Sequence, residues 1–433
     1  MGSYSLSSFK IRLIYTILNE NLNNDMPLDK AYAVYFQKLK LESQEQALII
    51  KLVNDVLRRL NYYCYIAGYK KIKDVKRHIN KLILVIHMLN DWPLPRDLPD
   101  TEDFSLKAAK IRKSEADEVN NLKYGCPMWL DNLCQKEIKD IWDNEKKFLS
   151  LEPKRYIRAN TLKTTVSDLQ NSLLTENIKT VTLPNHPDAL EVQGNCALFR
   201  TKAFKNGLFE QQDIGSQEIA YFLKVKPGMK VIDACAGFGG KTLHLSALMK
   251  GKGSITAMDL KEHKLLGLKE RAKRSGAFNI TTKVIENSKT IKRLHEKADR
   301  VLLDVPCSGL GVLKRNFDTK WVDRTDEIRE LAQIQKDILE RYSLMTKVGG
   351  KLVYSTCSIL PMENQNQVKD FLESHPNFKL EDEKFILPSQ GGDGFYMARM
   401  VRLDAKENLD NDESQENEIN ENEIIENNSD SLE

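Results

Sequence analysis

The sequence predicts an all-helical N-terminal domain followed by two α/β domains, of which the larger has a doubly wound parallel sheet. Three observations support this fold class. Helical periodicity fills the first 145 residues, short strands begin after Lys154, and strands alternate with helices from Pro227 onward. The predicted domains span residues 1–145, 146–213 and 214–403, and a disordered acidic tail spans residues 404–433.

The N-terminal domain is predicted from apolar residues that recur at helical spacing, with no segment that alternates with period two. The predicted helices are Phe9–Leu22, Leu28–Leu39, Glu45–Leu60, Val75–Leu89, Ala116–Gly125 and Met128–Phe148. The densest basic stretch of the chain also lies here, and its members are Lys70, Lys71, Lys73, Lys76, Arg77 and Lys81. This stretch is either a solvated helix face or a surface that contacts phosphates.

The second domain is predicted from short strands with one helix among them. The strands are Tyr156–Asn160, Asp188–Val192 and Gly207–Gln211, and the helix is Thr165–Glu176. This pattern is typical of a small α/β fold.

The third domain is predicted from regular alternation of strands and helices. The strands are Lys230–Cys235, Ser254–Asp259, Lys283–Glu286, Arg300–Val305 and Gly350–Cys357, and the helices are Lys241–Met249, Glu262–Ser275, Ile328–Thr346 and Glu363–Ser374. Such alternation predicts a parallel sheet with helices on both faces. Ligands of these sheets bind beyond the carboxyl ends of the strands.

The charge of the chain is unevenly distributed. Of the 433 residues, 41% are hydrophobic and 29% are charged, which is enough for several cores. Residues 404–433 hold twelve acidic residues and one lysine, whereas the rest carries 64 basic and 50 acidic residues, a net charge of +14. A basic body favours a partner with many negative charges, and the tail has too little apolar surface to order itself.

Cysteine usage and hydropathy exclude several classes of protein. The seven cysteines form an odd number without a Cys-x-x-Cys pair, which argues against a disulfide framework or a zinc ribbon. The longest apolar run, Leu82–Leu89, is far shorter than the ~20 residues of a membrane span, and the N-terminus lacks the apolar region of a signal peptide. We therefore expect a cytoplasmic monomer with reduced thiols, no metal and no membrane contact.

A glycine-rich turn joins the first strand of the third domain to its helix. The turn reads Asp233-Ala-Cys-Ala-Gly-Phe-Gly-Gly-Lys-Thr242, and its glycines let the backbone approach a ligand at a helix N-terminus. Nineteen residues after Gly240, Asp259 closes the second strand, where a carboxylate accepts hydrogen bonds from ribose hydroxyls. These features predict a nucleotide-like cofactor but do not separate a nicotinamide from S-adenosylmethionine.

Two cysteines follow neighbouring strands of the predicted sheet. The fourth strand continues into Asp304-Val-Pro-Cys307, and the fifth continues into Ser355-Thr-Cys357. A lone cysteine at such a place is usually a small buried apolar residue. Two cysteines at equivalent strand ends would share one crevice beside the cofactor, which indicates that they take part in catalysis.

With these motifs the sequence resembles the RNA cytosine-5 methyltransferases of the RsmB/Sun superfamily. The similar stretches are Cys235–Thr242, Asp304-x-Pro-Cys-Ser-Gly-x-Gly311, Thr356-Cys-Ser358 and Pro361-x-Glu-Asn364, and the similarity runs from about Met128 to Tyr396. The resemblance implies a Rossmann-like, S-adenosylmethionine-dependent methyltransferase domain that acts on RNA, with 16S ribosomal RNA as the expected substrate. By helix pattern and position, the N-terminal domain resembles the NusB-like RNA-binding domain of the RsmB branch. Residues 146–213 are expected to form a ferredoxin- or RRM-like RNA-binding subdomain.

The resemblance also implies roles for individual residues. Carbon-5 of cytosine is a poor nucleophile until a group adds to carbon-6, and a thiolate can make that addition. Cys357 is the implied nucleophile, and Cys307 is implied to assist loss of the carbon-5 proton. Asp304 is expected to hydrogen-bond the cytosine edge, and Lys241 to orient base or cofactor. The expected cofactor-binding residues are Cys235, Ala236, Gly237, Phe238, Gly239, Gly240, Lys241, Asp259, Asn287 and Asp304.

Some positions depart from the family pattern or leave their role open. The family usually has Ala-Pro where Gly237-Phe238 stand, so a bulky ring is expected near the cofactor. Asn287 stands where many members carry an Asp that contacts adenine. The segment 158–160, which matches a family segment, either contacts RNA or supports the fold. The residues expected to hold phosphates around a base turned out of its stack are Lys314, Arg315 and Lys320 near Trp321.

Other functions remain open at this point. A DNA cytosine-5 methyltransferase would use Cys307 as its nucleophile, and Cys357 in Thr-Cys-Ser argues against it. An RNA-binding ribosome-assembly or antitermination factor with an inactive methyltransferase domain is disfavoured by the intact Asp304 and both thiols. The sequence does not exclude transfer RNA or another RNA as the substrate. A dehydrogenase is disfavoured because no obvious motif supplies a hydride-transfer His or Tyr.

Overall fold

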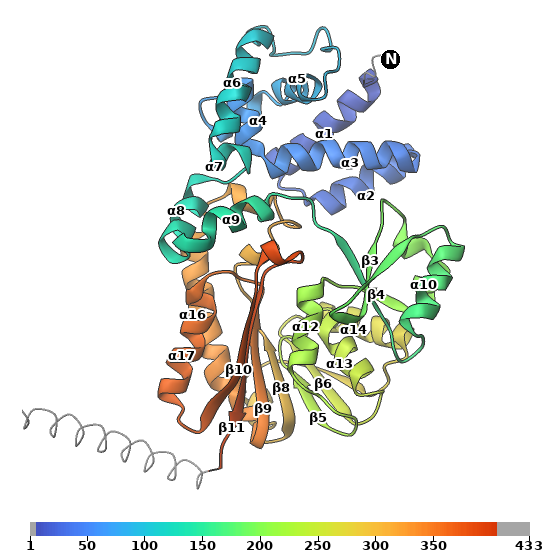
Figure 1. Cartoon of the computed structure of the whole chain (residues 1–433), viewed down its shortest axis with the longest axis vertical. Helices are drawn as coiled ribbons and strands as arrows, with labels where there is room; N and C mark the ends of the chain where they lie inside the picture. The colour runs from blue at the N-terminus through green and yellow to red at the C-terminus, as the bar shows by residue number, and fades with distance from the viewer. Residues whose placement is uncertain (1–5, 405–433) are drawn as a thin grey trace, which may run out of the picture. The chain divides into compact units, whose positions relative to one another are not determined.

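The computed structural model describes residues 6–404 and divides them into two compact units (Figure 1). The first unit comprises residues 6–152 and 313–325, and the second comprises residues 153–312 and 326–404. The predicted acidic tail lies outside the described residues apart from Asp404, as do the side chains of three members of the basic stretch, Lys73, Lys76 and Arg77. Within residues 6–404, no helix combines the length and apolar character of a membrane span.

The N-terminal part of the first unit is built from helices. These are α1 (Ser8–Asn24), α2 (Leu28–Leu39), α3 (Ser43–Arg58), α4 (Leu60–Ala67), η1 (Ile72–Arg77), α5 (Asn80–Leu89), α6 (Leu106–Glu118), α7 (Asn120–Lys123), α8 (Met128–Glu137) and α9 (Lys139–Leu149). Most of α6 escaped prediction because it is largely charged and buries only two alanines, Ala109 and Ala116. Whether this helical region is NusB-like stays a prediction.

The long helix predicted over residues 128–148 is wrong, because the backbone leaves the helical conformation at Ile138. Helix α9 then turns back, and Trp142 Nε1 donates to Asp131 Oδ1 of α8 at 2.7 Å. Lys146 Nζ lies 2.7 Å from the same carboxylate oxygen. The break lets the Trp142 ring reach 1% exposure with its indole nitrogen satisfied.

The segment 313–325 belongs to the core of the helical unit although it lies far along the chain. Trp321 Nε1 donates to the Leu57 carbonyl at 2.6 Å, and the Arg58 guanidinium donates to the Lys314 carbonyl at 2.7 Å. The Arg58 guanidinium also lies 4.3 Å from the ring centre of Phe317. Phe317 is 5% exposed within the apolar core of the unit, so this segment is held by packing as well as by hydrogen bonds.

The expectation that this segment presents lysines to phosphates is wrong for two of its residues. Lys314 and Lys320 are each 5% exposed. The Lys320 ammonium lies 5.1 Å from the Trp321 ring centre, and burial lowers the pKa of Lys320 to about 7. Both side chains are therefore buried and do not form a solvent-facing phosphate site.

The second unit begins with a small antiparallel sheet of strand order β2-β3-β1-β4. Its strands are β1 (Arg155–Ala159), β2 (Thr180–Leu183), β3 (His186–Val192) and β4 (Phe209–Gln211), with α10 (Val166–Thr175) packed on it. Strand β2 escaped prediction; it has only four residues, and none of them is buried.

The larger sheet of the second unit has seven strands in the order β10-β11-β9-β8-β5-β6-β7. Its strands are β5 (Lys230–Asp233), β6 (Ser254–Asp259), β7 (Ile280–Val284), β8 (Ala298–Asp304), β9 (Thr346–Thr356), β10 (Phe378–Ile386) and β11 (Phe395–Arg402). Successive residues alternate between two cores: Leu302 packs with α12 (Ile214–Phe222) and α13 (Gly240–Leu248), whereas Leu303 packs with α16 (Thr325–Tyr342) and α17 (Gln365–Ser374). Helices therefore cover both faces (Figure 1), which is the predicted doubly wound, Rossmann-like architecture.

The prediction of an entirely parallel sheet is wrong at one edge. Strands β9, β8, β5, β6 and β7 are parallel, but β11 pairs antiparallel with both β9 and β10. Strand β10 carries charged side chains that are almost all exposed, as edge strands commonly do, and this hid its apolar pattern. The sheet reverses its strand order between β5 and β8, and a ligand site is expected at that switch point.

We predict that Phe317→Ala lowers the free energy of unfolding by about 3–5 kcal/mol, because it opens a cavity in the core of the helical unit. Urea unfolding followed by tryptophan fluorescence measures the loss. Val322→Ala in the same segment is the control, since Val322 is 68% exposed and its truncation should cost little. Equal stability of the two variants would show that the segment is not held by the helical core.

Candidate active site

The glycine-rich turn lies at the carboxyl end of β5 and is fastened to the end of β6. Gly237 and Gly239 have positive φ angles of 53° and 82°, which L side chains rarely adopt. The Asp259 carboxylate accepts from the Gly237 amide at 3.0 Å and from the Lys261 amide at 2.8 Å. A Cβ at Gly239 would lie 2.4 Å from Leu268 Cγ, so this glycine is also required by close packing.

The turn leaves the room and the polar groups that S-adenosylmethionine needs. A Cβ on Gly237 or Gly240 would meet no atom within 4 Å, so space beside the backbone is open. Asp233 accepts from Thr242 Oγ1 at 2.6 Å, but its other carboxylate oxygen is buried without a hydrogen-bond partner. Burial raises the pKa of Asp233 to about 7. The open turn, the unsatisfied carboxylate and Asp259 together fit a cationic ligand with ribose hydroxyls.

Phe238 projects onto helix α14 (Glu262–Ser275) from the expected cofactor turn. Its ring is 51% exposed, and a Cβ on Gly267 of α14 would lie only 2.9 Å from that ring. The Arg271 guanidinium donates to the Phe238 carbonyl at 2.7 Å. Gly267 therefore accommodates the bulky residue that departs from the family pattern.

Three other predicted cofactor residues lie within the same turn or on a neighbouring element. Cys235 and Ala236 are partly buried just beyond the end of β5. Asn287 follows β7 and caps α15 (Ser288–Lys292), where its side-chain oxygen accepts from the Lys289 amide at 2.9 Å. The side-chain oxygen of Asn287 is thus already engaged in the fold.

Asp304 and Lys241 form an ion pair between the cofactor turn and the end of β8. Lys241 Nζ lies 2.7 Å from Asp304 Oδ2, and Ser355 Oγ donates to Asp304 Oδ1 at 3.1 Å. Burial opposes the charge on Lys241, but the Asp304 carboxylate outweighs it and raises the pKa of the lysine. The pair is fixed in position and remains partly accessible, with the Asp304 side chain 27% exposed.

The two strand-end thiols lie in contact with each other. Cys307 Sγ and Cys357 Sγ are 3.2 Å apart, and the Cys357 amide donates to Cys307 Sγ at 3.3 Å. Both cysteines are free and partly exposed. The hydrogen bond with Cys357 and burial raise the pKa of the Cys307 thiol. Asp304, Cys307 and Cys357 therefore meet at the carboxyl ends of β8 and β9, as the strand order allows.

The segment 158–160 supports the fold instead of facing a ligand. Arg158 is 2% exposed, and its guanidinium donates to the Gly240 carbonyl at 2.9 Å and to the Gln212 side chain. Asn160 is 4% exposed and donates to the carbonyls of Gly207 and Ser275 at 2.7 and 2.8 Å. The structural alternative holds, because neither side chain is accessible to RNA. Arg158 instead joins the small sheet to the start of α13.

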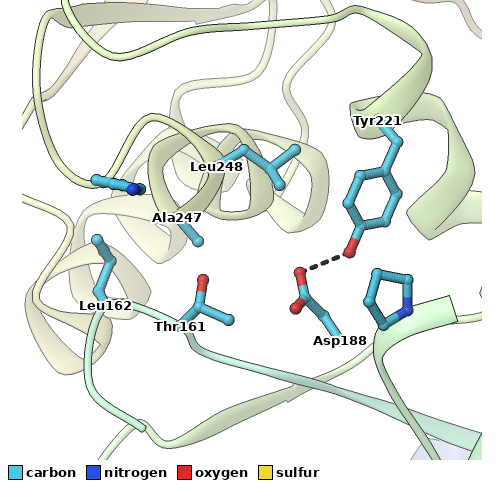
Figure 2. A pocket seen from close by; sticks show the side chains of 8 residues that line it. Thr161, Leu162, Asp188, Tyr221, Ala247 and Leu248 are labelled. Atoms are coloured by element: carbon cyan, nitrogen blue, oxygen red, sulfur yellow. Dashed lines mark hydrogen bonds between the residues drawn. The ribbon is translucent and has the colours of Figure 1, made fainter. Parts of the chain in front are cut away.

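A cavity of about 500 Å³ lies at the other end of α13, near Ala247 and Leu248 (Figure 2). It is about 12 Å along the helix from Gly240, and none of the predicted site residues lines it. Tyr221 donates to the Asp188 carboxylate within it at 2.6 Å. Because the cavity lies away from the glycine-rich turn and the two thiols, it is separate from the candidate active site.

Comparisons with known proteins identify the family. A family model described as 16S rRNA methyltransferase RsmB/F matches residues 220–403. The ribosomal RNA small subunit methyltransferase B of Photorhabdus laumondii is 27% identical over 433 residues, covering 93% of this chain and 99% of that protein. This chain belongs to the RsmB/Sun superfamily. It is thus a member of a family of RNA methyltransferases that use S-adenosylmethionine.

Other members of the superfamily and solved structures agree with this assignment. The probable ribosomal RNA small subunit methyltransferase B of Bacillus subtilis is 37% identical over 231 residues, 53% of this chain and 51% of that protein. The crystal structure of PH0851 has a TM-score of 0.77 and 25% identity, covering 92% of this chain and all of that one. NSun6 from Pyrococcus horikoshii, solved with SFG, shares the fold at a TM-score of 0.59 and 24% identity, over 64% of this chain and 98% of its own.

Sequence reasoning missed several contacts that hold the site of this superfamily member together. Ser355 bonds Asp304, and Arg158 bonds the cofactor turn through Gly240. Gln335 donates to the Pro306 carbonyl at 3.0 Å, just before Cys307. The spacing of motifs does not predict these contacts, because each contact joins elements that are distant in sequence.

We predict that Asp259→Ala weakens S-adenosylmethionine binding about tenfold or more, since both the turn and the ribose hydroxyls lose their acceptor. Isothermal titration calorimetry measures the dissociation constant. Exposed Glu262→Gln is the control, because it removes a nearby negative charge without touching the turn. Unchanged affinity of Asp259→Ala would mean that the cofactor lies elsewhere.

A second prediction concerns Asp233, whose pKa in the folded protein is raised to about 7 from 3.8. Between these values the folded state holds more protons than the unfolded state, so the free energy of unfolding falls as pH rises. In the ligand-free protein, Asp233→Asn should therefore be more stable than wild type at pH 8, with the difference shrinking toward pH 4. Urea unfolding at several pH values measures this, and exposed Asp337→Asn should show no such trend. A difference that is constant with pH would refute the raised pKa.

Proposed function

We propose that this protein methylates carbon-5 of a cytidine in RNA, most specifically in 16S ribosomal RNA, through a covalent bond between Cys357 and the base. The observation that carries the proposal is the 3.2 Å contact of the Cys307 and Cys357 sulfurs, next to the Asp304–Lys241 pair. A methyltransferase that forms no covalent bond to its substrate does not need two free thiols at neighbouring strand ends. Carbon-5 of cytosine becomes reactive only when a nucleophile adds to carbon-6, and a base must later remove the proton from carbon-5.

The hydrogen bonding of the two thiols supports Cys357 as the nucleophile. The raised pKa of Cys307 keeps that thiol protonated, so it can donate to a Cys357 thiolate and stabilise it. The thiolate adds to carbon-6 of cytosine, and Asp304, held by Lys241 and Ser355, is aimed to hydrogen-bond the base edge. S-adenosylmethionine supplies the electrophilic methyl group that carbon-5 then takes.

The contact between the two sulfurs also explains why Cys307 acts only after Cys357 has bonded to the base. Once Cys357 is bonded to carbon-6 it is no longer a thiolate, and the main influence that raises the Cys307 pKa disappears. Cys307 then loses its proton to solvent and, as a thiolate, removes the proton from carbon-5. The carbon-6 to sulfur bond breaks as the ring double bond reforms, and the Cys357 thiolate is released. The net balance is transfer of one methyl group and release of one proton.

The choice of ribosomal RNA rests on the relatives. The matching family model and the relatives from Photorhabdus laumondii and Bacillus subtilis all carry ribosomal RNA methyltransferase names. The charge of +14 outside residues 404–433 favours a polyanion of this kind. Bisulfite sequencing of 16S ribosomal RNA after incubation with the enzyme and S-adenosylmethionine tests both the base and the RNA.

The two thiols give the sharpest test, because their proposed roles fall on opposite sides of the covalent intermediate. Cys357→Ala should form neither 5-methylcytidine nor a protein–RNA adduct. Cys307→Ala should form the bond and transfer the methyl group but release the product slowly, so that a slowly migrating band appears on denaturing gels. That band should require S-adenosylmethionine.

The double variant Cys307→Ala, Cys357→Ala is the control and should lose the band. Cys196→Ala serves as a second control, since Cys196 lies in the small α/β region and is also a free thiol. A trapped band with Cys357→Ala instead of Cys307→Ala would reverse the two roles.

A further inference from the structure

The loops that carry the two thiols share a buried carboxylate, Glu363, which the proposed reaction does not use. Glu363 lies in the 3-10 helix η6 (Pro361–Glu363) and is 0% exposed. Within residues 6–404 its hydrogen-bond partners are neutral groups rather than lysine or arginine. A buried carboxylate without a cation is costly unless several donors satisfy it, so its presence calls for a reason.

Donors from both thiol loops converge on this one carboxylate. The Ser308 amide donates to Glu363 Oε1 at 2.8 Å, and Ser308 Oγ donates to Oε2 at 2.5 Å. Ser358 Oγ also donates to Oε2. Because Ser308 follows Cys307 and Ser358 follows Cys357, Glu363 ties the two loops together directly beside their sulfurs.

The carboxylate is itself fixed from the other side by the core. Gln335 Nε2 on α16 donates to Glu363 Oε1 at 2.9 Å and to the Pro306 carbonyl at 3.0 Å. The hydroxyl of Tyr354 on β9 donates to the Glu363 backbone carbonyl at 2.7 Å. Gln335 and Ser358 are 0% and 1% exposed, so this network cannot relax toward solvent.

We propose that Glu363 is a positioning residue that holds the Cys307 and Cys357 loops in contact and assigns the two thiols their separate roles. The proposal rests on the proposed function and extends it. The loop connection keeps the sulfurs 3.2 Å apart. The negative charge of Glu363 contributes to the raised pKa of Cys307, which keeps that thiol protonated beside Cys357.

Thiol alkylation of the RNA-free enzyme tests the charge without relying on methylation. The probe is iodoacetamide, and peptide mass spectrometry gives the alkylation rate of each cysteine from pH 6 to 9. In wild type, Cys357 should react faster than Cys307. In Glu363→Gln, which keeps the size of the side chain but not its charge, Cys307 should react faster and the ratio should fall about tenfold.

Methylation kinetics test the loop connection. Glu363→Ala should lower kcat about 100-fold, with the KM for RNA and the dissociation constant of S-adenosylmethionine within threefold of wild type, because the sulfurs move while the cofactor turn stays. Should this variant fail to fold, Ser358→Ala removes one connection and should lower kcat about tenfold. Glu373→Gln on α17, with its side chain 66% exposed, is the matched control for loss of charge.

An unchanged alkylation ratio in Glu363→Gln, or an unchanged kcat in Ser358→Ala and Glu363→Ala, would overturn the proposal even if wild type methylates cytosine. Failure of the proposed function has a different signature. Wild type would then make no 5-methylcytidine, and the alkylation ratio of the two thiols in the RNA-free enzyme would still report on Glu363.

Discussion

The parallel pairing of β8 with β9 is the constraint on which the site depends. The register aligns Asp304 with Ser355 at the carboxyl ends of the two strands. Cys307 lies three residues after Asp304, and Cys357 lies two residues after Ser355. A slip of one residue would turn every side chain of the strand to the opposite face, and it would separate the carboxylate from its serine and one sulfur from the other. The apolar alternation of Leu302 and Leu303 into two cores holds this register.

Much of the fold could be predicted because the central strands are buried and apolar. Strand β8 and the glycine-rich turn after β5 could be predicted from the sequence, because packing and backbone conformation restrict which residues these positions accept. The edge strand of the larger sheet was harder to predict. Strand β10 is charged and exposed, and a hydropathy pattern cannot distinguish such a strand from a loop. Helix α6 was hidden for the same reason, because few of its residues are buried.

The candidate site divides along a similar line. Asp259, Asp304 and the two thiols follow strands directly, so topology alone predicts that they lie near the same edge of the sheet. Arg158 was open to two interpretations, because only the three-dimensional contact with Gly240 decides between RNA and the interior. Lys320 was misread since a basic residue beside a tryptophan looks like an RNA contact until its burial is known. Glu363 was visible within a motif, yet the donors that give it meaning come from three separate elements.

The segment 313–325 has a practical consequence for dissecting this protein. It leaves the second unit shortly after Cys307 and returns to it at α16, yet its apolar side chains complete the helical core. A recombinant fragment starting at residue 153 would carry Phe317 and Trp321 without the helices that bury them. Such a fragment would expose an aromatic surface prone to self-association, so a soluble catalytic fragment would need a short polar bridge in place of this segment. The N-terminal helices and the methyltransferase sheet are therefore inseparable by a single cut in the gene.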